Sequence, residues 1–194
     1  MQKFFLWAVA ISALCSSCET ADEQLVENNN SLNTKTTVQP RTVNDFIVYT
    51  NVLNSFVYNY NETHDTNLIQ YQNHVNYIVP NHSGTEVIDF TQLNVLENAS
   101  NSIIEQFNYT TETKTAINAI LNNTFTTDML TTITNTQEYD LLNTLYAIKQ
   151  DGNGDYGDDE WKNKRSIAFA YGAQYHLTKA ILYAGAVGLK KHTL

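Results

Sequence analysis

Apolar residues recur at steps of three and four positions from residue 42 onward, and this spacing constrains the fold more than any other feature. The first run contains Phe46, Tyr49, Leu53, Phe56, Val57 and Tyr60. The second contains Leu68, Tyr71, Val75 and Ile78, and Pro80 ends it. Side chains at this spacing share one face of an α-helix. Strict alternation of apolar and polar residues, which indicates strands, is rare. The spacing therefore predicts helices.

Further apolar runs extend the same pattern toward the C-terminus. They lie in 89–109, as one helix or two, then around Ile117, Leu130 and Leu145, and finally in the longest stretch, 160–189. The rival interpretation is a β fold, because Thr, Tyr, Val and Ile favour strands. Asn and Thr are also mediocre helix formers, so helices of this composition depend on tertiary packing. We predict an all-α bundle of five to seven helices in residues 42–194.

The first seventeen residues have the features of a signal peptide. Lys3 supplies a positive charge, and an apolar run of eleven residues follows from Phe4 to Leu14. A membrane-spanning helix needs about twenty apolar residues, so this run is too short to be an anchor. We therefore expect residues 1–17 to be removed by a signal peptidase.

The segment Leu14-Cys15-Ser16-Ser17-Cys18 resembles the lipobox of bacterial lipoproteins. It differs from the common pattern in having Cys15 where an aliphatic residue usually stands. The resemblance implies that cleavage precedes Cys18 and that Cys18 then carries acyl chains such as palmitate, which hold the protein on a membrane. Ordinary secretion with cleavage nearby is the alternative. After cleavage before Cys18, that residue is the only cysteine and its sulfur is blocked, so we expect the mature chain to have no disulfide and no thiol nucleophile.

Residues 18–41 are predicted to be a flexible tether that follows the lipidated cysteine. They lack a hydrophobic period and are rich in Asn, Thr, Glu and Gln. The acidic residues Glu19, Asp22 and Glu23 follow Cys18 directly. This cluster is similar to the export signals of some Gram-negative lipoproteins, and the resemblance implies a place at the outer membrane, facing the periplasm or the cell surface.

Charge is segregated along the chain. All twenty acidic residues and four basic ones lie between 19 and 160, whereas 161–194 holds six basic residues and no acidic one. The net charge of −9 argues against a nucleic-acid partner, which requires a basic surface. The basic, Gly/Ala-rich helix predicted for 160–189 has two interpretations. It packs against the acidic bundle, or it engages a membrane or a partner protein.

A Gly/Asp-rich segment, 151–160, resembles the first half of a calcium-binding loop of the EF-hand or dockerin type. The resemblance implies that Asp151, Asn153, Asp155 and Asp159 are oxygen ligands for calcium. Two positions depart from that pattern, because Tyr156 replaces a glycine and Lys162 replaces the final bidentate acid. The alternative is a turn whose acidic residues favour the start of the next helix.

The sequence contains no recognised catalytic motif, such as His-Glu-x-x-His or Gly-x-Ser-x-Gly. We therefore predict a lipid-anchored cell-envelope protein with a binding or structural role, with an envelope protein as a possible partner, and we favour a non-enzymatic function. There are two alternatives. One is a small envelope hydrolase with an unrecognised site, and the other is a membrane-active effector that acts through its basic C-terminal helix.

Overall fold

The computed structural model describes residues 44–81, 83–151 and 159–189, which belong to one compact unit, Gln39–Leu194. Within these ranges every regular element is helical, which confirms the all-α prediction. The α-helices are α1 (Asn44–Ser55), α2 (His64–Ile78), α3 (Phe90–Glu97), α4 (Thr111–Leu121), α5 (Thr136–Gln150), α6 (Asp159–Ala173) and α7 (Leu177–Leu189). Two 3-10 helices, η1 (Asn101–Gln106) and η2 (Thr127–Thr132), lie between them.

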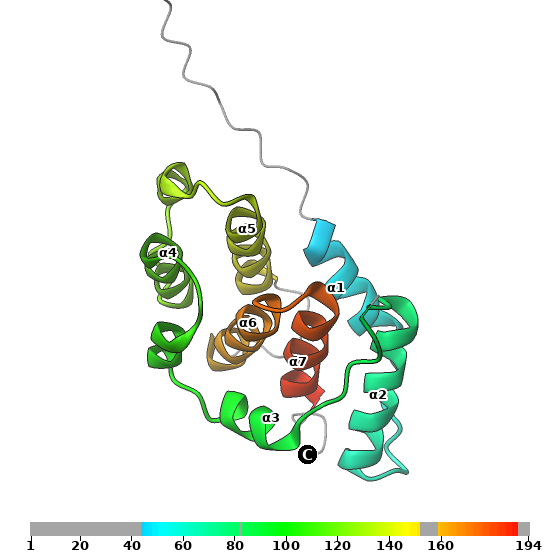
Figure 1. Cartoon of the computed structure of the whole chain (residues 1–194). Coiled ribbons are helices and arrows are strands. Elements are labelled where there is room, and N and C mark those ends of the chain that lie inside the picture. The colour runs from blue at the N-terminus through cyan, green and yellow to red at the C-terminus, as the bar shows by residue number, and fades with distance from the viewer. Residues whose placement is uncertain (1–43, 82, 152–158, 190–194) are drawn as a thin grey trace, which may run out of the picture. The chain divides into compact units, whose positions relative to one another are not determined.

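Helix α7 forms the centre of the fold, and Figure 1 shows α1, α2, α3 and α6 arranged around it. From Ala180 to Leu189 every residue of α7 is buried. A helix that is apolar on all sides is stable only inside a core, where each face contacts another element. The apolar face of the C-terminal segment is therefore used inside the bundle, as the packing interpretation predicts.

The segment 160–189 is not one continuous helix, and this corrects the sequence prediction. The chain leaves α6 after Ala173 and starts α7 at Leu177. The two helices pack antiparallel. Their contacts show this, since Gly172 lies against Ala180 and Gly188 lies against Arg165. A Cβ atom on Gly172 would overlap the backbone of Ala180. The glycine thus permits the close approach that makes a hairpin more favourable than a single long helix.

The start of α7 is held by His176 and by the loop that follows α2. The Nδ1 atom of His176 accepts a hydrogen bond from the Lys179 backbone N–H at 3.2 Å, and its Nε2 atom lies 2.8 Å from Glu86 Oε1. Thr178 Oγ1 donates to the Val79 carbonyl at 2.9 Å. Nδ1 thus contacts the first turn of α7, and Nε2 faces the Glu86 carboxylate. Together they fix the loop against the core helix.

Helices α2 to α5 each begin with a polar side chain that caps the exposed backbone N–H groups. The capping residues are Thr63, Asp89, Thr110 and Asn135. A cap of this kind contributes about 1 kcal/mol to helix stability. The caps offset part of the low helix propensity of an Asn- and Thr-rich sequence.

The second apolar run matches its helix, whereas the first extends beyond it. In α2, Leu68, Tyr71 and Val75 are buried. Helix α1 ends at Ser55, and beyond it Val57 is 82% exposed and Tyr60 71% exposed. The connection that follows is bound by Asn67, a buried residue of α2.

Asn67 binds the connection between α1 and α2 through its side-chain amide. Its Oδ1 atom accepts from the Asn59 backbone N–H at 2.7 Å, and its Nδ2 atom donates to the carbonyl groups of Asn59 and Thr63, each at 2.9 Å. These bonds hold the connecting backbone in a turn. Val57 and Tyr60 therefore do not belong to a helix face.

Two shorter predictions have simple outcomes. The segment 89–109 forms two helices, α3 and η1, and the run around Leu130 forms the 3-10 helix η2 rather than an α-helix.

The predicted signal peptide 1–17, Cys18 and the tether 18–41 lie outside the described residues. Of the helices described, none is both long and apolar enough to cross a membrane.

Candidate functional site

The predicted calcium loop lies largely outside the described residues. Asp151 follows the last turn of α5 and is half-buried. Asn153 and Asp155 lie outside the described ranges, as does the side chain of Asp159 at the start of α6. In the part of the chain that is described, no group of three His, Cys, Asp or Glu side chains is placed to hold a metal ion. Calcium binding thus stays a prediction.

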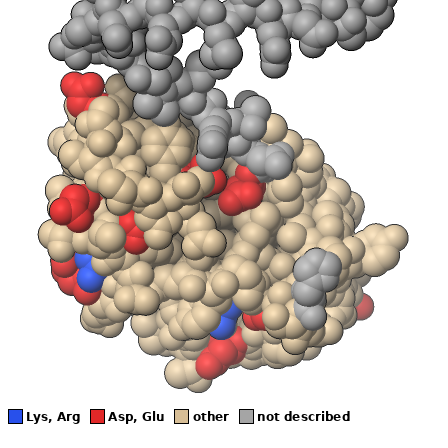
Figure 2. Space-filling model, turned by 45° about the horizontal axis from the view of Figure 1, so that its top comes forward, with Lys and Arg blue, Asp and Glu red and all other residues tan. Residues whose placement is uncertain are grey.

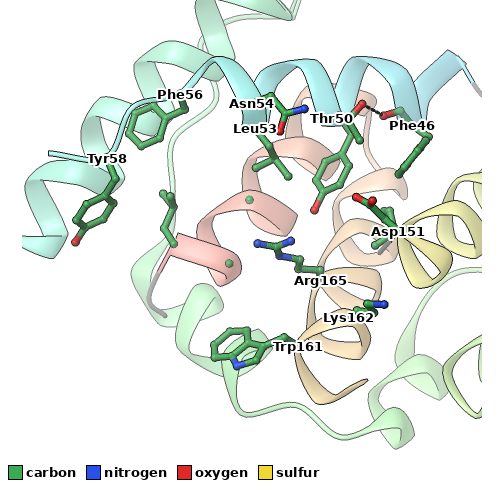
Figure 3. A pocket seen from close by; sticks show the side chains of 15 residues that line it. Phe46, Thr50, Leu53, Asn54, Phe56, Tyr58, Asp151, Trp161, Lys162 and Arg165 are labelled. Carbon is green, nitrogen blue, oxygen red and sulfur yellow. Dashed lines mark hydrogen bonds between the residues drawn. The ribbon is translucent and has the colours of Figure 1, made fainter. Parts of the chain in front are cut away.

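A cavity of about 390 Å³ opens between α1, the end of α5, and the α6–α7 pair (Figure 3). Its volume is in the range of small-molecule sites, about 300–1,000 Å³. Helix α1 and the residues after it supply Phe46, Tyr49, Thr50, Leu53, Asn54, Phe56 and Tyr58. The rest of the wall consists of Ile148, Asp151, Trp161, Lys162, Arg165, Gly185, Gly188 and Leu189. The cavity thus combines aromatic walls with three charged side chains.

Arg165 is the central polar group of this cavity. Figure 3 shows its guanidinium extending from α6 into the cavity, in the space between α1 and Trp161. The guanidinium lies against the backbone of Gly188 in α7, and a Cβ atom at Gly188 would overlap it. A side chain at position 188 would therefore require the guanidinium to move.

Tyr49 adds a second polar group, from the opposite wall. The residue is only 2% exposed, and its hydroxyl has no hydrogen-bond partner among the described residues. Its ring packs edge-on against Phe169, with the ring centroids 5.8 Å apart. The pKa of Tyr49 is raised, mainly because the hydroxyl is buried. The nearby charge of Arg165 opposes this effect, and that of Asp151 adds to it. Among the described residues this neutral donor has no acceptor, a condition that costs about 1–3 kcal/mol in a buried position.

The charge of the cavity differs from that of the rest of the domain. Its charged lining residues are Asp151, Lys162 and Arg165, two cations and one anion. The face shown in Figure 2 is mostly uncharged, with acidic side chains in several places and few basic ones among them. The described lining therefore has a net charge of +1, in a protein whose total charge is −9.

A second cavity of about 510 Å³ is acidic and lies on α5 near the α6–α7 turn. Its lining includes Asp45, Glu138, Asp140 and His176. Burial raises the pKa of Asp45, and the nearby carboxylate of Asp140 raises it further. The polar groups of Glu138 and His176 already have partners in the fold, as the bonds of His176 to α7 and to Glu86 illustrate. Glu138 and His176 therefore serve as structural contacts between elements of the fold.

Glu138 links α5 to the start of α4. Its carboxylate accepts from the Thr110 backbone N–H at 3.1 Å and from the hydroxyls of Thr110 and Thr113, each at 2.6 Å. Burial alone raises the pKa of Glu138, but these hydrogen bonds outweigh that effect and lower it. The ionised carboxylate therefore stabilises the N-terminus of α4.

Sequence reasoning identified the basic residues of 161–194 but not the cavity that two of them line. Trp161, Lys162 and Arg165 lie within five positions, and an aromatic residue beside two cations is a weak signal of a binding surface. The hydroxyl of Tyr49 is more than a hundred positions away in the sequence. Only the packing of α1 on the α6–α7 pair brings these residues to one cavity.

Comparisons with known protein families, with curated proteins and with solved structures find no match to this chain. The fold and the cavity are therefore the basis for a functional conclusion.

Proposed function

We propose that this chain is a lipid-anchored envelope protein whose helical domain binds a small organic molecule in the cavity between α1 and the α6–α7 pair. The observation that carries the proposal is the buried Tyr49 hydroxyl, which lines the cavity without a described partner. A buried donor in that state is stabilised by a ligand that supplies an acceptor. Aromatic walls and a few polar groups are the usual composition of such sites.

The anchoring half of the proposal depends on Cys18. It is supported by the resemblance of residues 14–18 to a lipobox and by the acidic residues that follow. Two or more acyl chains suffice for stable attachment to a bilayer. Mass spectrometry of the chain purified from envelopes of its native bacterium tests this directly. We expect an N-terminal Cys18 with acyl chains, and Cys18→Ala moves the protein to the soluble fraction.

The membrane-active alternative would require a large rearrangement. The apolar residues of α7 contact α2, α6 and other helices of the bundle, so a membrane could reach them only after the hairpin had opened. Hydrolase activity stays a prediction of the sequence. Binding needs only the groups that the cavity already presents.

A cavity-filling substitution tests the binding half of the proposal. Leu53 is half-buried in the cavity wall, so Leu53→Trp is expected to fill the space and abolish binding. Ile47→Trp is the matched control, because Ile47 lies on the same helix, is 52% exposed and does not line the cavity. Calorimetry with three naphthalene probes, one anionic, one neutral and one cationic, measures the effect. Binding of none of them, or equal binding by both variants, contradicts the proposal.

A further inference from the structure

We infer that the cavity selects an organic monoanion, a carboxylate joined to an aromatic or similarly flat apolar group. This inference rests on the proposed function and specifies its ligand class. It depends on three features of the described residues: the charge balance of the lining, the arrangement of hydrogen-bond donors and the aromatic walls.

The charge balance favours a single negative charge. With Lys162 and Arg165 against Asp151, the described lining has a net charge of +1. One added carboxylate brings this set of charges to neutrality. A cation would increase the positive charge in a partly desolvated space, and a dianion would leave an unmatched negative charge beside Asp151. The domain as a whole carries more acidic than basic residues, so the two cations of the lining are the groups that would draw an anion to this cavity.

Two side chains of the lining are of the kind that donate hydrogen bonds to a carboxylate. Arg165 presents a planar fork of N–H groups, which matches the two oxygens of a carboxylate. Tyr49 adds a hydroxyl donor from the facing helix, and this hydroxyl has no acceptor in the described structure. A carboxylate only accepts hydrogen bonds and can take several at once. The guanidinium lies against Gly188 of α7, which also lines the cavity.

The remaining walls fit an apolar group. Trp161 borders the cavity on the side of α6, and Phe46, Phe56 and Tyr58 border it on the side of α1 (Figure 3). Aromatic faces stack on flat rings and also contact apolar chains. A cavity of roughly 150 Å³ accommodates benzene, so about 390 Å³ suits a ligand of two fused rings with its carboxylate.

The experiment uses the mature chain from residue 18 with Cys18→Ala, so that acyl chains do not themselves bind the probes. Calorimetry compares 2-naphthoate with its neutral amide and with 2-naphthylmethylammonium, which share the ring system and differ in charge. We expect 2-naphthoate to bind at least about tenfold more tightly than the amide, and the cation to bind most weakly. Raising the salt concentration should weaken only the binding of the anion.

Variants then assign the selectivity to named residues. Arg165→Gln is expected to lower the affinity for 2-naphthoate at least about tenfold and to leave the affinity for the amide unchanged. Lys114→Gln is the matched control, because Lys114 lies on α4 and donates to the Glu105 carbonyl, away from the cavity. If Arg165→Gln lowers the melting temperature strongly, Lys162→Gln replaces it, since Lys162 is also part of the lining.

The outcomes separate this inference from the proposed function. Preferential binding of the amide or the cation, lost in Leu53→Trp, overturns the anion selectivity and leaves the binding cavity in place. Equal loss of 2-naphthoate affinity in Arg165→Gln and Lys114→Gln overturns the role of the cavity cations. Binding of none of the probes counts against both the ligand class and the binding site.

Discussion

The α6–α7 pair and the helices around it are stabilised in different ways. In α7 the residues from Ala180 to Leu189 are all buried, and glycines let neighbouring groups approach its backbone. Helices α2 to α5 instead begin with capping side chains and bury only part of their surface. The comparison teaches that a chain with many poor helix formers can build a bundle around one helix that is fully enclosed.

The same comparison explains where polar groups enter the core. Gly185 leaves room for the hydroxyl of Tyr71, which donates to the Ile181 carbonyl at 3.0 Å, and Gly188 leaves room for Arg165. Each glycine of α7 thus accommodates a polar side chain from another helix. Around the outside, polar contacts occur at helix ends, as with Glu138 at the start of α4.

The largest difference between the two regions is expected from truncating an apolar side chain. Leu182→Ala removes a side chain that is fully buried in α7 and should lower the free energy of unfolding by about 3 kcal/mol. Ile69→Ala, at a position of α2 that is 50% exposed, should lower it by no more than about 0.5 kcal/mol. Urea denaturation measures both. Similar losses would show that α7 is not the centre of the core.

A glycine substitution tests the close contact within the pair. In an open helix Gly→Ala is stabilising by about 0.5–1 kcal/mol. At Gly172 the added Cβ atom would overlap the Ala180 backbone, which cannot rotate away, so Gly172→Ala should be destabilising by about 2 kcal/mol. Thermal unfolding followed by circular dichroism gives the sign. A higher melting temperature would contradict the packing described here.

The outer helices are tested through Glu138. Glu138→Gln weakens the hydrogen bonds to Thr110 and Thr113 and should lower the free energy of unfolding by about 1.5 kcal/mol at neutral pH. Glu62→Gln, at an exposed position, should change it by less than about 0.5 kcal/mol. Urea denaturation at neutral pH compares the two variants.

The pH dependence of the Glu138 effect follows from its lowered pKa. Its folded-state pKa lies below the ordinary value of 4.5, so the unfolded chain takes up the proton first as pH falls. The stabilisation is complete above that ordinary value and is lost as pH falls through the folded-state pKa. The difference between wild type and Glu138→Gln should therefore shrink in acid. A difference that stays constant would contradict the role of the ionised carboxylate.

The smallest expected effect concerns Asp45 and Asp140, where α1 meets α5. The raised pKa of Asp45 means that its charge is unfavourable in the folded state at neutral pH, and this cost disappears as pH falls below its ordinary value of 3.8. Asp140→Asn removes the neighbouring charge and should stabilise the protein by up to about 0.5 kcal/mol at neutral pH. Asp128→Asn, at an exposed position, is the control. A stabilisation that persists in acid would exclude this repulsion as its cause.

Local spacing predicted much of the helical architecture. The run from Leu68 to Val75 follows a single helix face, and the interruption at Pro80 marks a helix end that the structure confirms within two residues. The helix ends that were missed depend on distant groups. Asn67 bonds to the connection after α1 across eight positions, and no local pattern at Val57 indicates this contact.

The helical class, the uneven distribution of charge and the candidate lipidation of Cys18 can all be read from residues that are close together in the chain. The break between α6 and α7, the burial of α7 and the cavity that joins Tyr49 to Arg165 cannot be read in this way. They arise when helices distant in sequence pack against one another. This packing determines which glycine contacts a neighbouring helix and which cation lines a cavity. Short-range periodicity carries no information about that choice.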